Sequence, residues 1–208
     1  YLTWEGSTEK ARRVLEEASQ TISSTEDPLF VNTWFLVEVF DGKYQEALDR
    51  LSLAPADALA KQFFFIPKAQ LSAQIHGLMN RPQLALADYD TARVLLETKL
   101  QEQPQDDRLH SSLGIAYAGL GRVEEAIREG KMGVELMPVS KEAWRGLCRV
   151  EDLARIYVMV GEYDAAIDQL EFLLSRPGDL SIPLLRLDPL WKPLWDHPRF
   201  QELVEKYE

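Results

Sequence analysis

The stretch LHSSLGIAYAGLGRVEEAIREGKMGVELMP, residues 109–138, contains two successive helix patterns with a glycine between them. In its first half, apolar residues recur at helical spacing: Leu109, Leu113, Ala116, Tyr117 and Leu120. Gly121 then occupies the position where a left-handed residue commonly ends a helix. The second half opens with Glu124 and Glu125, which favour a helix N-terminus, and stops at Pro138. The stretch therefore predicts a helical hairpin.

The same arrangement recurs along the chain at a nearly constant period. The matching segments are VFDGKYQEALDRL (39–51), LMNRPQLALADYDTA (78–92), YAGLGRVEEAIREG (117–130), YVMVGEYDAAIDQL (157–170) and a fainter first copy, WEGSTEKARRVLEEA (4–18). Aligning them superposes Ala11, Ala47, Ala85, Ala126 and Ala166, with spacings of 36, 38, 41 and 40 residues. A period in this range is typical of a solenoid.

The small residues of this pattern have a physical explanation. Where the two helices of a unit cross closely, a side chain larger than alanine would push them apart. Gly130 and Gly133 lie inside a predicted helix, where glycine is unfavourable, and we expect them to permit close packing against the next unit. A single helical hairpin leaves its apolar face uncovered, so the units must stack. No long strand-like alternation competes with this pattern, and the predicted fold class is all-α.

The repeats resemble the tetratricopeptide repeat family. In residues 109–138 the family's spacing is matched by Leu113, Gly114, Tyr117, Gly121, Ala126 and Pro138. A second copy, LARIYVMVGEYDAAIDQLEFLL (153–174), matches at Leu153, Ala154, Tyr157, Gly161 and Ala166. Earlier copies depart from it, with Trp34 and Phe35 in place of Leu and Gly and His76 in place of the tyrosine. The resemblance covers most of residues 4–175 and implies a right-handed superhelix of about five helical hairpins.

We expect this array to span residues 1–180, with an incomplete first repeat, and a cap at residues 181–208 to cover its last face. The stretch LDPLWKPLWDHPRF (187–200) is the core of the cap, with Asp188 and Asp196 starting turns or helices ahead of prolines. One apolar stripe follows on a final helix: Phe200, Leu203, Val204 and Tyr207. Trp191, Leu194 and Trp195 are expected to fill the gap beneath that helix. The alternative is a ligand site with aromatic walls around His197.

Residues 124–144 and 163–204 also resemble the C-terminal repeat region of bacterial multidomain proteins. In those proteins a TolB-like segment precedes the repeats, and a kinase, nucleotide-cyclase or winged-helix module lies further upstream. The resemblance implies a sensory or assembly arm of a bacterial signalling protein. The chain starts at Tyr1 in the middle of a repeat, so we expect it to be part of a longer protein. The expected location is the bacterial cytoplasm, with the periplasm as the alternative.

Composition and motifs argue against several kinds of function. A net charge of −11 disfavours direct binding of nucleic acid. The chain has no apolar run long enough for a membrane span, no Gly-rich phosphate loop, and a single cysteine, Cys148. Its histidines, His76, His110 and His197, are far apart in sequence. We therefore expect no enzymatic activity, no cofactor and no metal site.

The expected function is protein–protein interaction, with a protein or peptide partner in the concave groove. Positions outside the family's packing columns are predicted to face it: Asn32, Leu36, Gln70, Gln74, Arg108, Ser111, Ile115, Arg145, Arg149 and Arg155. Arg145, Arg149 and Arg155 form a local basic group that would attract an acidic peptide. Alternatively, these arginines form salt bridges with Glu142, Glu151 and Asp152.

Two other functions remain open from the sequence. Self-association into a homo-oligomer could use the apolar edge of the incomplete first repeat, which carries Leu2 and Trp4. Sensing of a small ligand in the groove would require a deep apolar pocket.

Overall fold

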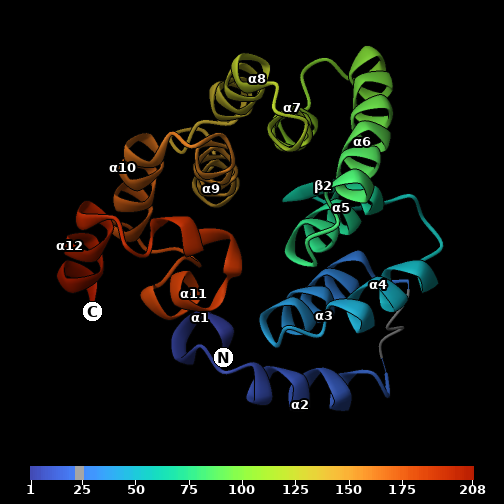
Figure 1. Cartoon of the computed structure of the whole chain (residues 1–208), viewed down its shortest axis with the longest axis horizontal. Helices are drawn as coiled ribbons and strands as arrows, with labels where there is room; N and C mark the ends of the chain where they lie inside the picture. The colour runs from blue at the N-terminus through green and yellow to red at the C-terminus, as the bar shows by residue number, and fades with distance from the viewer. Residues whose placement is uncertain (22–25) are drawn as a thin grey trace.

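Paired helices make up most of the molecule in the computed structural model, which describes residues 1–21 and 26–208 (Figure 1). The α-helices are α1 (Leu2–Glu5), α2 (Thr8–Ala18), α3 (Pro28–Phe40), α4 (Tyr44–Leu53), α5 (Lys68–Leu78), α6 (Pro82–Glu102), α7 (Asp107–Gly119), α8 (Val123–Leu136), α9 (Ala143–Val160), α10 (Tyr163–Leu174), α11 (Ile182–Leu187) and α12 (Pro198–Tyr207). A 3-10 helix, η1 (Pro189–Leu194), lies between α11 and α12. Two strands, β1 (Ala58–Lys61) and β2 (Phe64–Pro67), separate α4 from α5.

Local sequence signals explain where the helices begin and end. The Asp27 side chain accepts hydrogen bonds from the backbone amides of Leu29 and Phe30, at 2.9 and 3.0 Å, and so caps the start of α3. Gly121 and Gly161 have positive φ angles of 74° and 83° just after α7 and α9. Glycine adopts this conformation without a steric penalty, so both residues stop their helices as predicted.

Consecutive helices pack in pairs: α3 with α4, α5 with α6, α7 with α8, and α9 with α10. The alanines that the sequence alignment superposed are all at most 9% exposed: Ala47, Ala85, Ala126 and Ala166 lie on the second helices of these pairs, and Ala11 lies on α2, which packs against α3. Neighbouring pairs stack through α6 against α7 and α7 against α9. The chain is a helical solenoid, and the predicted fold class is confirmed.

Two glycines inside α8 lie where helices approach closely. A Cβ atom on Gly130 would lie 2.6 Å from Ile156 Cδ1 of α9, and one on Gly133 would lie 2.5 Å from Ser111 Oγ of α7. Real Cβ atoms do not approach other atoms this closely. Gly130 therefore permits close packing against the next unit, as expected, whereas Gly133 permits close packing within its own hairpin, against α7.

The two ends of the described chain meet. Helix α1, only one turn long, packs against α11 near the C-terminal segment, whereas α2 packs against α3 (Figure 1). Ser181 Oγ donates a hydrogen bond to the Thr3 carbonyl oxygen, and a Cβ on Gly6 would lie 3.3 Å from Pro183 Cβ. The incomplete first repeat is thus not an open edge, and the array curves into a closed ring.

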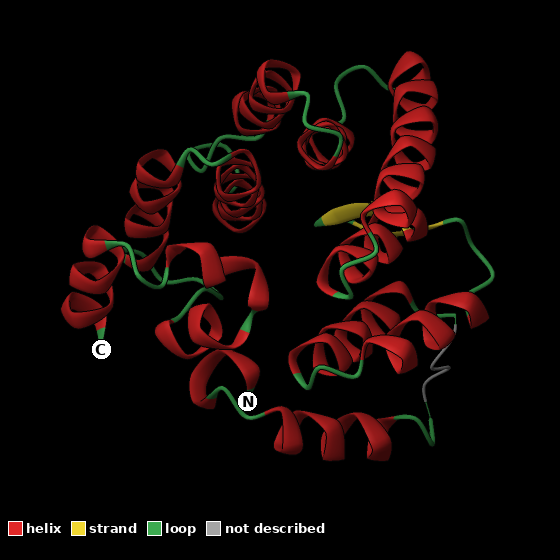
Figure 2. Ribbon diagram, in the orientation of Figure 1, coloured by secondary structure: helices red, strands yellow, loops and turns green. Residues whose placement is uncertain are grey.

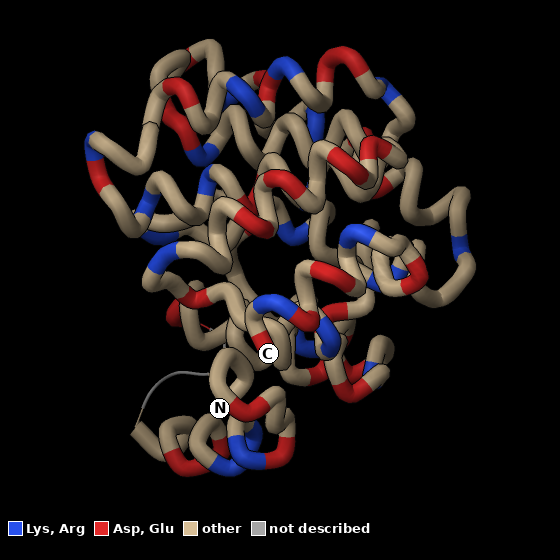
Figure 3. The backbone as a smooth tube through the Cα atoms, turned by 90° about the vertical axis from the view of Figure 1, so that its left-hand side faces the viewer, with Lys and Arg blue, Asp and Glu red and all other residues tan. Residues whose placement is uncertain are grey.

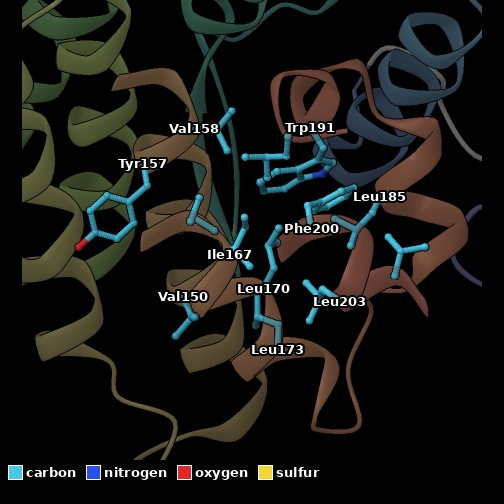
Figure 4. Packing of buried hydrophobic residues seen from close by; sticks show 14 of the residues in the cluster. Val150, Tyr157, Val158, Ile167, Leu170, Leu173, Leu185, Trp191, Phe200 and Leu203 are labelled. Atoms are coloured by element: carbon cyan, nitrogen blue, oxygen red, sulfur yellow. The ribbon is translucent and has the colours of Figure 1, made fainter. Parts of the chain in front are cut away.

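The C-terminal elements cover the apolar faces of α9 and α10 (Figure 4). The buried side chains that α11, η1 and α12 contribute are Ile182, Leu185, Trp191, Leu194, Phe200, Leu203 and Val204. Trp195 differs from expectation, because its side chain is 38% exposed. A 3-10 helix has three residues per turn, so Trp191 and Leu194 share one face and Trp195 points away from it. Asp196 also does not cap α12: its N-cap is His197, with no side-chain hydrogen bond.

The β-hairpin is absent from the all-α prediction (Figure 2). Its strands pair antiparallel, with Ala58 opposite Pro67 and Lys61 opposite Phe64. Each strand has four residues, too few for the alternation by which a strand is recognised in sequence. The hairpin lies between helix pairs and contacts α3, α5, α6 and α7.

Charged residues of both signs are interspersed along the helices (Figure 3). Most ion pairs join residues three or four apart or link neighbouring helices, as in Arg199 with Asp164 and Asp168. Among the described residues, no helix combines the length and the apolar character that crossing a membrane requires.

Candidate functional site

The concave side of the ring contains a cavity of about 410 Å³. Helices α3, α5 and α9 and the 3-10 helix η1 supply most of its walls, and Tyr89 and Tyr163 come from α6 and α10. The apolar walls include Phe35, Leu36, Val39, Phe40, Ile75, Val158, Met159 and Leu190. Because residues from α3 and from η1 line the same space, the cavity exists only when the ring is closed.

The apolar cavity has one polar corner, formed by Gln74, Arg155 and Asp188. Arg155 Nη2 lies 2.8 Å from Glu151 Oε1 and 3.3 Å from Asp188 Oδ2. Burial opposes the charge on Arg155, but Asp188 and Glu151 outweigh it and raise the pKa of the guanidinium. Asp188 is 5% exposed, and its other oxygen accepts from the Leu190 amide at 3.0 Å, which caps η1. The corner is therefore a fixed ion pair.

A larger depression of about 620 Å³ lies on the outer surface of the cap, beside Trp195, Phe200 and Val204. Its other lining residues are the charged or polar side chains Arg186, Gln201, Glu205 and Glu208. Only α11, the end of η1 and α12 with the C-terminal residue line this depression, and most of its lining is polar or charged. The apolar cavity, which elements from both ends of the chain line, is the better candidate for a binding site.

Of the groove residues expected from the sequence, Leu36, Gln74 and Arg155 line the cavity. Asn32 is half-buried on α3, while Gln70 is buried at the start of α5. Ile115 is part of the core between α7 and α9. The remaining residues, Arg108, Ser111, Arg145 and Arg149, gather elsewhere.

These four residues lie together on a second surface, formed by α7 and α9, which we call the α7–α9 face. The buried carboxylate of Asp107 lies at its centre. Asp107 is 3% exposed, and its oxygens lie 2.6 Å from Arg145 Nη2 and 3.2 Å from Arg149 Nη1. Arg149, 2% exposed, also pairs with Asp152 at 3.0 Å. Ser111 is buried in the same region. The arginines are thus neutralised by acids: Arg149 pairs with Asp152, as the salt-bridge alternative anticipated, whereas the Arg145 guanidinium pairs with Asp107 instead of Glu142.

Asp107 was missed by the sequence reasoning. Asp107 follows Asp106 directly, and Asp106 caps α7 by accepting a hydrogen bond from the Arg108 amide at 3.0 Å. From the sequence alone, Asp107 is therefore interpreted as part of the same cap. Its partners on α9 lie 38 and 42 residues away. This sequence separation equals about one repeat. A search for charged residues of opposite sign at equivalent positions of adjacent repeats could therefore have found the pairs that Asp107 forms.

A known protein family matches the part of the chain that contains the α7–α9 face. Residues 83–150 match the tetratricopeptide repeat model. This tetratricopeptide segment comprises α6, α7, α8 and the first part of α9, and it includes the α7–α9 face. It confirms the family resemblance over these residues. A tetratricopeptide repeat is a helical scaffold for protein interaction.

Two solved structures are also similar to the chain: "MamA 41-end from Desulfovibrio magneticus RS-1" and "MamA RS-1 ArsTM double mutant". Each is 21% identical, with 82% of this chain and 85% of that chain covered, and the TM-scores are 0.36 and 0.35. No curated protein matches the chain.

Within the tetratricopeptide segment, His110 joins α7 to α8. Its Nδ1 lies 2.7 Å from Glu129 Oε2, and its Nε2 lies 3.1 Å from the Pro104 carbonyl oxygen. Burial alone would lower the pKa of His110, but these two acceptors favour the protonated ring and raise the pKa above 6.5. The pair is a structural link between two helices.

The other groups with possible chemistry are also part of the packing. His76 Nδ1 lies 2.9 Å from Asp88 Oδ2, across α5 and α6. Burial, assisted by Asp152 and Glu151, raises the pKa of the Cys148 thiol to about 12, which makes it a poor nucleophile. Across residues 1–21 and 26–208, histidine, cysteine and acidic side chains form no group of three suited to a metal ion.

Proposed function

We propose that the chain is a protein-interaction module that holds an apolar segment of a partner protein in its central cavity. One observation supports this most directly: an apolar cavity of about 410 Å³ with a single polar corner lies on the concave side of the solenoid. Binding pockets commonly measure about 300–1,000 Å³ and combine apolar walls with a few polar groups that fix orientation.

The residues that line the cavity indicate which side chains a partner segment needs in order to bind there. Leu36, Phe40 and Leu190 offer apolar contact to one or two large side chains. Gln74 supplies an amide, which can donate to or accept from the partner backbone. Arg155 already has two carboxylate partners, so an acidic partner residue would gain little there. The expected ligand is therefore an apolar segment with at most one polar contact.

The resemblance to bacterial multidomain proteins supports a further proposal about context. According to this proposal, the module is the C-terminal arm of a larger bacterial signalling or regulatory protein, and the arm is located in the cytoplasm. The proposal assigns no chemical reaction to this arm.

A test of the interaction compares two leucines. Leu36→Lys places a charge in the cavity wall, whereas Leu84→Lys alters an exposed leucine on α6 outside it. We expect partner proteins that copurify with the chain to be lost from Leu36→Lys and retained by Leu84→Lys. Circular dichroism should show equal helicity for both variants. Retention of the same partners by both variants would refute a role for the cavity.

Sensing of a small molecule is the second candidate, and the mainly apolar lining that six elements contribute to the cavity favours it. Thermal-shift screening with small apolar compounds tests it: stabilisation of the wild type but not of Leu36→Lys would support a small ligand. For self-association, the two residues expected at the edge differ: Leu2 packs against the core formed by α2 and α3, whereas Trp4 is 79% exposed. Light scattering at two concentrations would reveal self-association.

A further inference from the structure

Three side chains on the α7–α9 face hold the backbone of the β-hairpin. Arg108 Nη1 donates to the Lys61 carbonyl oxygen at 2.7 Å, and Arg149 Nη2 donates to that of Phe63 at 2.6 Å. Ser112 Oγ donates to the Phe65 carbonyl oxygen. The three carbonyls belong to every second residue of 61–65. Recognition of alternate main-chain groups is how proteins bind an extended peptide with little regard to its sequence.

Aromatic contacts supplement these hydrogen bonds. The Phe63 ring lies 6.3 Å from that of Trp144 at the start of α9, tilted by 60°. Phe65 packs against the core between α6 and α7. Both phenylalanines are only half-buried, and Gln62 between the strands is exposed. The tip of the hairpin, residues 61–65, thus lies on the surface of α7 and α9 as a bound peptide would.

The base of the hairpin is anchored separately from the tip. Leu59 is 2% exposed and belongs to the core formed by α3, α4 and α5. The Lys68 side chain donates to the Ala54 carbonyl oxygen at 2.6 Å, and the Lys68 amide donates to that of Asp57. Outside the α7–α9 face, the polar contact of the tip is the partly exposed ion pair of Lys61 with Asp27, a kind that contributes little. Within the tip, Phe64 packs against the same core and pairs with Lys61 across the strands, so displacement of the tip must also break these contacts.

The α7–α9 face also has donors that the tip does not use. Arg145 Nε and Arg149 Nε are buried and have no hydrogen-bond partner among the described residues. A buried charged group without its full set of hydrogen bonds is costly. The tip therefore fits this face incompletely.

We propose that the α7–α9 face is a binding site for an extended, phenylalanine-containing segment of a partner protein, and that the hairpin tip occupies it as an intramolecular competitor. A partner segment that supplies the same alternate carbonyls and aromatic side chains displaces the tip. This site is separate from the central cavity and does not depend on the function proposed for it.

The experiment uses a fluorescent peptide of residues 57–68, DALAKQFFFIPK, as the probe. In one variant of the full chain, residues 61–65 are replaced by Gly-Ser-Gly-Ser-Gly, which empties the face and keeps Leu59 and Pro67. Fluorescence anisotropy should show binding to this variant and about 100-fold weaker binding to the wild type, whose tethered tip competes at high effective concentration. Adding Arg149→Gln, or replacing the three peptide phenylalanines by serine, should abolish the binding.

A second, smaller change tests the same proposal in case the variant with the replaced tip does not fold. Phe63→Ser removes one half-buried ring that contacts Trp144, and Gln62→Ser is its control at an exposed neighbour. We expect a gain in peptide affinity from Phe63→Ser and none from Gln62→Ser. A folded tip variant that does not bind the peptide, or equal binding by Phe63→Ser, Gln62→Ser and the wild type, would overturn the proposal.

Discussion

At the scale of single residues, close approaches decide which positions tolerate change. Gly146, in the first turn of α9, is a clear case: a Cβ there would lie 2.6 Å from both Val139 Cα and Val139 N. These are backbone atoms of the loop before α9, so they cannot rotate away as a side chain can. Gly77, near the end of α5, has no atom within 4 Å of its Cβ position.

This contrast predicts opposite effects of the same substitution. Gly146→Ala should destabilise the protein by about 1–3 kcal/mol, because the loop must move. Gly77→Ala should stabilise it by up to about 1 kcal/mol, because alanine favours a helix. Urea denaturation of both variants measures the change in the free energy of unfolding. Equal effects would contradict the packing described around Gly146.

His110 makes stability depend on pH. Its pKa is raised in the folded protein, so its contribution is complete below the unfolded pKa of 6.5 and is lost as pH rises through the folded value. We expect the free energy of unfolding to fall as the pH rises from about 6 to 8. His110→Gln should remove that part of the slope, as followed by urea denaturation at each pH. An unchanged slope in His110→Gln would rule out this histidine as its source.

The candidate site could be predicted only in part from single residues. Gln74 and Arg155 were found because the resemblance places them on first helices, facing the groove. Asp188 was assigned only to capping, although it also pairs with Arg155. Val39 lines the cavity from α3, which has buried residues on nearly all sides. No helical periodicity distinguishes the cavity side of such a helix from its core side.

At the scale of elements, a helix could be predicted where its apolar residues recur at helical spacing and a capping residue marks its end. Both signals lie within the helix itself. The hairpin could not be predicted, because its strands are short and its stability comes from Arg108, Ser112 and Arg149 on distant helices. The expectation that Trp195 fills the gap beside Trp191 and Leu194 was wrong, because the 3-10 helix η1 turns Trp195 away from their face. Such errors arise where tertiary contacts or unusual turns decide the outcome.

Two tryptophans of the cap provide a matched pair for stability. Trp191 is completely buried against α9 and α10, whereas Trp195 is 38% exposed. Trp191→Ala should cost about 3–5 kcal/mol, because it leaves a large cavity in the core. Trp195→Ala should cost much less. Thermal unfolding followed by circular dichroism compares the two, and similar melting temperatures would contradict the cap packing.

At the scale of the whole molecule, the closed ring could not be predicted from the repeats. Periodicity describes how each unit packs on the next, but the contact of α1 with α11 joins residues almost a full chain apart. Sequence spacing contains no information about such a contact. The cavity depends on it, because α3 and η1 form opposite walls.

Deletion of residues 1–5 should therefore open the ring. Spin labels at Thr33 and Lys192, in a Cys148→Ser background, would report the separation of α3 from η1. We expect a longer and broader distance distribution after the deletion. Trp4→Ala is the control, because this side chain is 79% exposed and its loss leaves the backbone contact of Thr3 intact. An unchanged distribution after the deletion would show that α1 does not hold the ring closed.

The contact between α1 and α11 also changes how the molecule should fluctuate. In a linear repeat array the terminal units have one neighbour each, so they fray and their amides exchange faster than those in the middle. Here the first and last parts of the array stabilise each other. The rate of amide exchange should therefore show no gradient from the centre toward the ends, and the protein should open as one cooperative unit.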